Sequence, residues 1–351
     1  MDSLPRPAQY VFQEGFGSAR ANALRRAGRP EEAIPHLRQI LRHRPDWAEA
    51  HLALGECLLL TGHFLPGWQE LEWRWRMLPN DPRADFPQPL WDGGNIAGKR
   101  IFLWAEQGFG DTIQFIRYAT LIKNLGAKVL VECQAPLVRL LAGSRAIDGI
   151  VPYGAPLPAF DCHLPLQSIP ALLNTPLDSI PNEVPYLTVP GQLVAHWRER
   201  IHSLPGKRIG LVWAGNPQQS NDRNRSMPLS KFKPLAGLSG ITWVSLQKGD
   251  AASQPVPSGL QLAYPGTDWL DFADTAAIIQ SLDLVVSADT AVAHLAGALA
   301  RPVWTLLCTP PDYRWLLDRQ DSPWYPTMRH YRQAAPGDWD SVIRRIVRDL
   351  L

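Results

Sequence analysis

The feature that most constrains this fold is a strand–helix–strand pattern, seen most clearly at 282–307, LDLVVSADTAVAHLAGALARPVWTLL. Its first six residues form a β-branched apolar run, which is typical of a strand buried on both faces of a parallel sheet. After Thr290, small and apolar residues recur at helical spacing until Arg301-Pro302, and the remaining residues predict the next strand. Such alternation predicts right-handed crossovers and a parallel sheet.

The pattern occurs in two series, separated by a proline-rich break at 180–191. The first series predicts helices at 111–125 and 136–141 between strands at 100–105, 128–133, 149–153 and 161–166. The second series predicts strands at 208–213, 242–246, 282–287 and 303–307. We therefore predict an α/β fold with two Rossmann-like lobes, each built on a parallel sheet.

The first eighty residues repeat with a period of 34, and the equivalent pairs are Gly28/Gly62, Ala33/Gly67, Leu37/Leu71 and Pro45/Pro79. This is the period of the tetratricopeptide repeat, a helix–turn–helix unit that stacks on copies of itself. The first copy begins near Glu14, and two copies fall short of the roughly three needed for independent stability. We expect the repeats to rest on the following domain, on a second protomer in a homo-oligomer, or on a partner.

Three tryptophans end the second copy, in 68-WQELEWRWRM-77. Trp68 and Trp75 are seven residues apart and share a helix face, whereas Trp73 points elsewhere. One face is expected to dock on the following domain. The other would be open to a protein acceptor or a second protomer, because tryptophan is enriched at such contacts. A purely structural role for the repeats is an equal alternative.

These patterns divide the chain into five parts: a helical repeat unit at 1–80, a proline-rich linker at 81–97, an N-terminal lobe at 98–190, a C-terminal lobe at 191–335 and a C-terminal helix at 336–351. The formal net charge of +2 gives no indication of a nucleic-acid partner. The four cysteines form no C-x-x-C, so neither a disulfide frame nor a metal knuckle is indicated. The N-terminus lacks an apolar core of signal-peptide length, and no transmembrane run is present, so we expect a cytoplasmic protein.

The polar feature of the first series is 104-WAEQGFGDTIQFIRY-118, where Asp111 stands at the start of a helix. Gly108 and Gly110 are expected to permit a tight turn and close approach of a ligand. The loop for an acceptor or phosphate would comprise Gly108, Gly110, Thr112 and Gln114. Alternatively, Asp111 only caps the helix. The incomplete G-x-G-x-x-G disfavours a dehydrogenase, and the lack of a G-K-[ST] disfavours phosphoryl transfer from ATP.

The second series places polar groups after three of its strands: Asn216 and Arg225 in the first loop, Gln247 and Lys248 after the next strand, and Asp289 and Thr290 after the third, with His294 one turn into the helix. Ligands bind at this edge of open α/β sheets. Arginine pairs with phosphate oxygens, and a helix start offers N–H groups to an anion. The alternatives are a solvated loop, a helix cap at Asp289 or Thr290, and a core histidine at His294.

These stretches, together with 311-PDYRWLLDRQDSPWYPTMRHYRQ-333, resemble the tetratricopeptide-containing branch of glycosyltransferase family 9, which includes the ADP-heptose-dependent heptosyltransferases. The resemblance covers nearly the whole chain, and its most specific parts are G-D-T at 110–112 and D-T-x-x-x-H at 289–294. It implies a GT-B fold, with the acceptor on the N-terminal lobe and a nucleotide-sugar donor on the C-terminal lobe.

By position, the resemblance implies that Asp111 is the catalytic base and that Asp289, Thr290 and His294 bind the donor. The family's phosphate-binding lysine has no match in 216–232, and Arg225 would take its part. Asn216, Gln247 and Lys248, which follow strands of the same series, complete the predicted donor site. Ala291 stands where the heptosyltransferases often have glycine. The implied reaction is an inverting transfer, without metal or cofactor, from a nucleotide-diphosphate sugar to a hydroxyl of a protein or cell-envelope glycan. The alternatives are a non-catalytic tetratricopeptide adaptor on a GT-B scaffold and a GT-B nucleotide-sugar epimerase.

Overall fold

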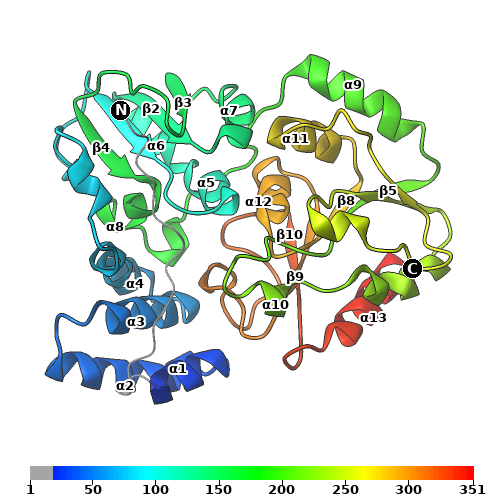
Figure 1. Ribbon diagram of the computed structural model, residues 1–351, viewed down its shortest axis with the longest axis horizontal. Helices are drawn as coiled ribbons and strands as arrows, with labels where there is room; N and C mark the ends of the chain where they lie inside the picture. The colour runs from blue at the N-terminus through cyan, green and yellow to red at the C-terminus, as the bar shows by residue number, and fades with distance from the viewer. Residues whose placement is uncertain (1–18) are drawn as a thin grey trace. The chain divides into compact units, whose positions relative to one another are not determined.

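The computed structural model describes residues 19–351, which divide into two compact units (Figure 1). Unit 1 contains the chain up to Ala135, with 145–181 and 310–319, and unit 2 contains 136–144, 182–309 and 320–351. This division differs from the predicted one, because the repeats and the first sheet form a single unit. Residues 310–319 follow a strand of unit 2 in sequence but belong to unit 1. The predicted start of the first repeat, near Glu14, lies outside the described residues.

The repeats form the stacked helices α1 (Ala19–Arg26), α2 (Pro30–His43), α3 (Ala48–Leu60) and α4 (Phe64–Leu71) (Figure 1). Gly28 and Gly62 occupy the turns within each helix pair, with φ of 71° and 86°. Glycine adopts such positive φ angles without steric penalty. The 34-residue spacing thus marks equivalent left-handed turns in two equivalent helix pairs.

Helices α3 and α4 approach closely because glycines face one another. A Cβ atom at Gly67 would lie 2.7 Å from the side chain of Leu59, and one at Gly55 would lie 3.1 Å from the Gly67 carbonyl oxygen. Side chains at either position would push the two helices apart. The small residues found in the repeat pattern are therefore required by packing.

The tryptophan segment docks on the first sheet of unit 1, as expected. Helix α4 ends at Leu71 and continues as the 3-10 helix η1 (Glu72–Met77). Trp68 and Trp75 are each 2% exposed; the Trp68 indole N–H donates to the Thr175 carbonyl at 3.0 Å, and the Trp75 ring lies 5.6 Å from Trp104. Trp73 instead stacks on His51 of α3 at 3.7 Å, so its ring is packed within the repeats rather than presented to a partner.

The sheet of unit 1 is parallel, with strand order β3-β2-β1-β4. Its strands are β1 (Arg100–Trp104), β2 (Lys128–Cys133), β3 (Gly149–Pro152) and β4 (Cys162–Pro165). The predicted helix at 111–125 begins earlier and is interrupted, giving α5 (Phe109–Phe115) and α6 (Tyr118–Asn124). The short helix α8 (Ile169–Leu172) packs beside α4.

The sheet of unit 2 is also parallel, with strand order β10-β9-β8-β5-β6-β7. Its strands are β5 (Lys207–Val212), β6 (Ile241–Ser245), β7 (Leu262–Ala263), β8 (Leu284–Ala288), β9 (Val303–Leu307) and β10 (Met328–Arg332). Its helices include α7 (Ala135–Leu141), α9 (Gly191–His202), α10 (Asp222–Arg225), α11 (Phe272–Gln280), α12 (Ala291–Ala298) and α13 (Trp339–Leu350). Strands β7 and β10 were not predicted. Both predicted parallel sheets are confirmed.

The four cysteines, Cys57, Cys133, Cys162 and Cys308, are buried free thiols. Within residues 19–351, none of the helices has both the length and the apolar character needed to cross a membrane.

Candidate active site

Asp111 of unit 1 lies in the first turn of α5, after the loop that follows β1. One of its carboxylate oxygens accepts a hydrogen bond from the Gly108 N–H at 2.9 Å, so the side chain does cap the helix. Gly108 has a φ of −71°, and Gly110 is helical, so neither glycine uses the positive φ angles that glycine permits in a tight turn. Gly108 is instead suited to close approach, because a Cβ atom there would lie 3.3 Å from the Asp111 carboxylate.

The second carboxylate oxygen of Asp111 accepts a hydrogen bond from the guanidinium of Arg314, which also belongs to unit 1. Arg314 donates in addition to the Asp312 carboxylate at 2.9 Å and to the side-chain oxygen of Gln114. Its guanidinium carbon lies 4.5 Å from the centre of the Tyr313 ring. Arg314 therefore fixes the orientation of Asp111.

Burial raises the pKa of the Asp111 carboxyl above its usual range, while the Arg314 guanidinium opposes this rise by favouring the charged form. The Asp111 side chain keeps 25% of its surface exposed, so a substrate hydroxyl can reach it. Each carboxylate oxygen has two lone pairs and can accept a further hydrogen bond. A carboxylate with a raised pKa is a better general base near neutral pH.

Thr112 and Gln114, predicted to face an acceptor or phosphate, are buried instead. Thr112 is 1% exposed, and its hydroxyl donates to the side-chain oxygen of Gln134 at 2.9 Å. Gln114 is 0% exposed and bonds to Arg314. These two side chains support the site from behind rather than line it.

In unit 2 the loop after β5 meets the turn after β8. The Arg225 guanidinium donates to the Asp289 carbonyl oxygen at 2.9 Å and to the Asp222 carboxylate at 3.2 Å. A Cβ atom at Gly215 would lie 2.6 Å from the same guanidinium. Arg225 and Asp289, 64 residues apart, are thus brought together, while Asn216 is exposed and its side-chain oxygen accepts from the Gln218 N–H at 3.1 Å.

Thr290 is the N-cap residue of α12, but its hydroxyl does not cap the helix. It pairs with the Ser287 hydroxyl at 3.2 Å. The N–H groups of the first helical turn have no partner along the helix itself and suit an anion. His294 is 5% exposed, and its Nδ1 lies 2.9 Å from the Tyr325 hydroxyl, which places this histidine in the core.

The side chains of Gln247 and Lys248 form hydrogen bonds to backbone groups of unit 2. The Gln247 amide oxygen accepts from the N–H groups of Trp213 and Ala214 at 3.0 and 2.9 Å, and its amide nitrogen donates to the Ala214 carbonyl at 3.0 Å. The Lys248 ammonium donates to the Trp269 carbonyl at 2.6 Å, and burial lowers the pKa of this lysine. Gln247 therefore shapes the loop after β5.

Sequence reasoning missed Arg314 and a buried ion pair formed by Arg74 of η1. Arg74 donates to both carboxylate oxygens of Glu106, at 2.8 and 3.0 Å, and to the Ser168 hydroxyl at 2.7 Å. Glu106 lies in the same loop as Gly108. The one local hint was the position of Arg314 between two aromatic residues, Tyr313 and Trp315. Nothing in the sequence indicated that Asp111 is its partner.

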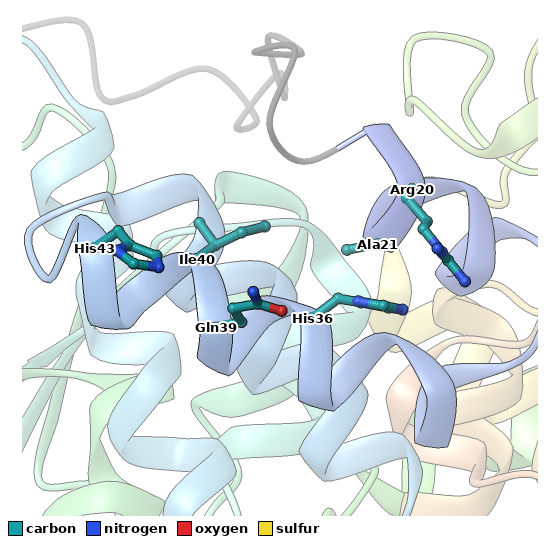
Figure 2. Close-up of a pocket in the computed structure, with 6 residues that line it drawn as sticks. All are labelled: Arg20, Ala21, His36, Gln39, Ile40 and His43. Carbon is teal, nitrogen blue, oxygen red and sulfur yellow. The ribbon is translucent and has the colours of Figure 1, made fainter.

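The described residues of unit 1 line cavities away from Asp111. One of about 270 Å³ lies between α1, which contributes Arg20 and Ala21, and α2, which contributes His36, Gln39, Ile40 and His43 (Figure 2). Another, of about 540 Å³, is bordered by Phe86, Glu132 and Phe160 among others. Neither cavity is lined by a residue that the sequence assigned to the site.

Comparison with known families supports both parts of the chain. Residues 18–64 match the tetratricopeptide repeat model, and residues 269–324 match the model of glycosyltransferase family 9 (heptosyltransferase). The second match contains Asp289, Thr290, His294 and Arg314. A curated relative, Protein FlbA of Caulobacter vibrioides, is 27% identical over 331 residues, which cover 87% of this chain and 55% of FlbA. The chain thus spans about half the length of that relative.

Solved structures are similar at low sequence identity. A glycosyl transferase of family 9 from Veillonella parvula has a TM-score of 0.54 and 11% identity, and the match covers 74% of this chain and 97% of that one. The ADP-heptose lps heptosyltransferase II of E. coli gives a TM-score of 0.49 and 12% identity over 72% of this chain and 97% of that one. The Veillonella match shows that the fold is that of family 9, the GT-B fold. The predicted resemblance is confirmed: a tetratricopeptide segment precedes a family 9 glycosyltransferase fold.

Proposed function

We propose that this protein is a metal-independent, inverting glycosyltransferase that moves a sugar from a nucleotide-diphosphate sugar to an acceptor hydroxyl. The observation that carries the proposal is the Asp111 carboxylate. It is oriented by Arg314, reachable from solvent and raised in pKa, in a chain with a family 9 segment.

In the proposed reaction, Asp111 takes the proton of the acceptor hydroxyl as that oxygen forms a bond to the anomeric carbon. The bond from this carbon to the diphosphate oxygen breaks, and the nucleoside diphosphate leaves with the electron pair. A single displacement without a covalent intermediate inverts the anomeric centre. A general base of this kind contributes about 10²–10⁴ in rate.

Unit 2 would hold the donor. The N-terminus of α12 offers N–H groups and the positive end of its dipole to the diphosphate. Arg225 uses two of its five N–H donors in the bonds described above, and the others suit phosphate oxygens. Lys248 adds positive charge, and Asp289 would accept hydrogen bonds from sugar hydroxyls. Stabilising the leaving group in this way requires no metal ion.

The acceptor would be a protein or a cell-envelope glycan bound on the repeat side of unit 1. Stacked repeats commonly present extended binding surfaces. The cavity between α1 and α2 supports this part of the proposal, since Arg20 gives it positive charge and His36 and His43 add hydrogen-bonding groups (Figure 2). A second protomer on the repeats would make a homo-oligomer instead.

One observation favours the non-catalytic adaptor: each oxygen of the Asp111 carboxylate already accepts a hydrogen bond within the protein.

Thermal unfolding in the presence of a panel of nucleotide sugars tests whether the protein is a glycosyltransferase or an adaptor. A donor at about 100-fold its Kd adds about 2.7 kcal/mol of stability. Product analysis with the stabilising donor then separates transfer from epimer formation. If no nucleotide sugar stabilises the protein, the adaptor function replaces the proposed one.

A further inference from the structure

We propose that the tetratricopeptide repeats are part of the machinery that positions the catalytic base. Trp68 of α4 holds residues 310–319, and that segment in turn holds Arg314 against Asp111. The catalytic meaning rests on the proposed function, whereas the chain of contacts lies entirely within unit 1 and does not depend on it.

Trp68 is the junction in this chain of contacts. Its ring meets Phe115 of α5 edge-on, with centroids 6.3 Å apart, and Tyr313 edge-on at 6.0 Å. One side chain of the repeats thus touches both the helix that carries Asp111 and the segment that carries Arg314. Trp68 is itself fixed by its hydrogen bond to the Thr175 carbonyl.

Other parts of the repeats also meet residues 310–319. The 3-10 helix η7 (Tyr313–Trp315) packs against α3. A Cβ atom built at Gly28, in the turn of the first repeat, would lie 3.7 Å from the Pro310 side chain. Both repeats therefore support the segment, and Trp68 is the side chain among them that also contacts the helix of Asp111.

The backbone of this segment needs such support. Leu316 has φ 55° and ψ −172°, a conformation that is largely confined to glycine. Strained backbone of this kind persists only where the surrounding packing determines it, and Leu316 and Trp315 are 7% and 0% exposed. Loosening the packing would let the segment relax, and Arg314 would move with it.

A displacement of Arg314 would change the pKa of Asp111, and the direction follows from the surrounding charges. Arg314 favours the charged form of Asp111, so a weaker contact raises the pKa of Asp111 further. The groups that act on this pair are Asp312 and Tyr313 of the same segment and Glu56 of α3, whose partner is Arg25 of α1, while Arg74 of η1 acts on Tyr313. Three of the four contributing elements, α1, α3 and η1, come from the repeats or their last turn.

The experiment follows the titration of Asp111 directly in the full chain, by ¹³C NMR of side-chain-labelled aspartate. Its signal is identified by its loss in Asp111→Asn. In Arg314→Met the proton affinity of Asp111 should rise about tenfold or more, because an opposite charge within contact distance is removed. Trp68→Phe should shift the titration in the same direction by less, and Arg314→Lys should lie between Arg314→Met and the natural protein.

Trp75→Phe is the matched control. Trp75 is as buried as Trp68 and undergoes the same substitution, but it packs on Trp104, and phenylalanine keeps a ring beneath the Arg74 guanidinium. It should lower stability by a similar amount and leave the Asp111 titration in place. If Trp68→Phe does not fold, Trp68→Tyr answers the question, because it also alters the repeat side of the contact and leaves Tyr313 and its contact with Arg314 in place.

Equal shifts in Trp68→Phe and Trp75→Phe, or a shift in Arg314→Met alone, would overturn the proposal. If the titration moves as expected but no nucleotide sugar gives turnover, the positioning role stands and the proposed function fails. Where turnover is measurable, the acid limb of kcat should move to higher pH in Trp68→Phe while the KM for the donor stays unchanged.

Discussion

The two candidate sites are built in opposite ways. In unit 1, hydrogen bonds converge on one side-chain group, the Asp111 carboxylate, from the Gly108 N–H and the Arg314 guanidinium. In unit 2, predicted site side chains bind backbone: Arg225 bonds to the Asp289 carbonyl, and Gln247 bonds to Trp213 and Ala214. The first arrangement tunes the charge of one group, and the second fixes the shape of two loops.

This difference predicts different consequences for substitutions. Changes around Asp111 should act on the chemical step, because they alter the orientation and proton affinity of a single carboxylate. Changes around Arg225 and Gln247 should act on donor affinity, because they alter the loops that would hold the donor. Separating kcat from donor Kd in each variant tests the contrast.

The largest expected effect is that of Asp111→Asn. The amide keeps the shape of the side chain but cannot accept the proton, so turnover should fall by about 10²–10⁴ while donor affinity is unchanged. Steady-state kinetics and donor titration measure the two quantities. Near-normal turnover would remove Asp111 as the base and leave it a helix cap.

The next effect concerns the contribution of the buried Arg74–Glu106 ion pair to the stability of unit 1. Arg74→Met leaves the Glu106 carboxylate buried without its cation, which should lower the free energy of unfolding by about 3–5 kcal/mol. Arg76→Met is the control, because Arg76 is exposed on the same 3-10 helix. Denaturant unfolding compares them. Equal small losses in both variants would show that the repeats are not anchored through Glu106.

A smaller effect is expected in unit 2 from Arg225→Ala. Removing the guanidinium frees the turn at Asp289 and takes a cation from the donor phosphates, so donor affinity should weaken about tenfold to a hundredfold. Arg223→Ala, an exposed position in the same loop, should change affinity little. Calorimetric titration decides the matter. If kcat falls while Kd is unchanged, the contrast between the two units fails.

The sequence predicted that Arg225 and Asp289 lie at the same edge of a parallel sheet, and the structure brings them into contact because β5 and β8 are neighbours. Polar residues that follow adjacent parallel strands lie at the same sheet edge. The contact between Asp111 and Arg314 could not be predicted, because 203 residues separate them and residues 310–319 belong to the unit that their sequence position does not suggest. The local sequence pattern does not indicate that residues 310–319 return from unit 2 to unit 1.

Local pattern also explains which strands could be predicted from the sequence. Strands β2 and β9 were predicted at their observed bounds because buried parallel strands are apolar runs. Strands β7 and β10 were missed because they are the two edge strands of their sheet. An edge strand pairs with a neighbour on one side only, so its sequence need not be a continuous apolar run. Strand β10 is MRHYR, in which alternate polar residues obscure the apolar pattern, and β7 has only 2 residues.

The smallest expected effect is that of removing metal ions. If Arg225, Lys248 and the start of α12 neutralise the leaving diphosphate, turnover should survive EDTA with less than about a twofold change. The contrast between the sites sharpens this test, because a loop fixed through its backbone should keep its shape without a cation. Arg225→Ala assayed with and without magnesium is the matching variant. Complete loss in EDTA, restored by magnesium or manganese, would instead make Asp289 a metal ligand and assign the neutralising charge to the ion.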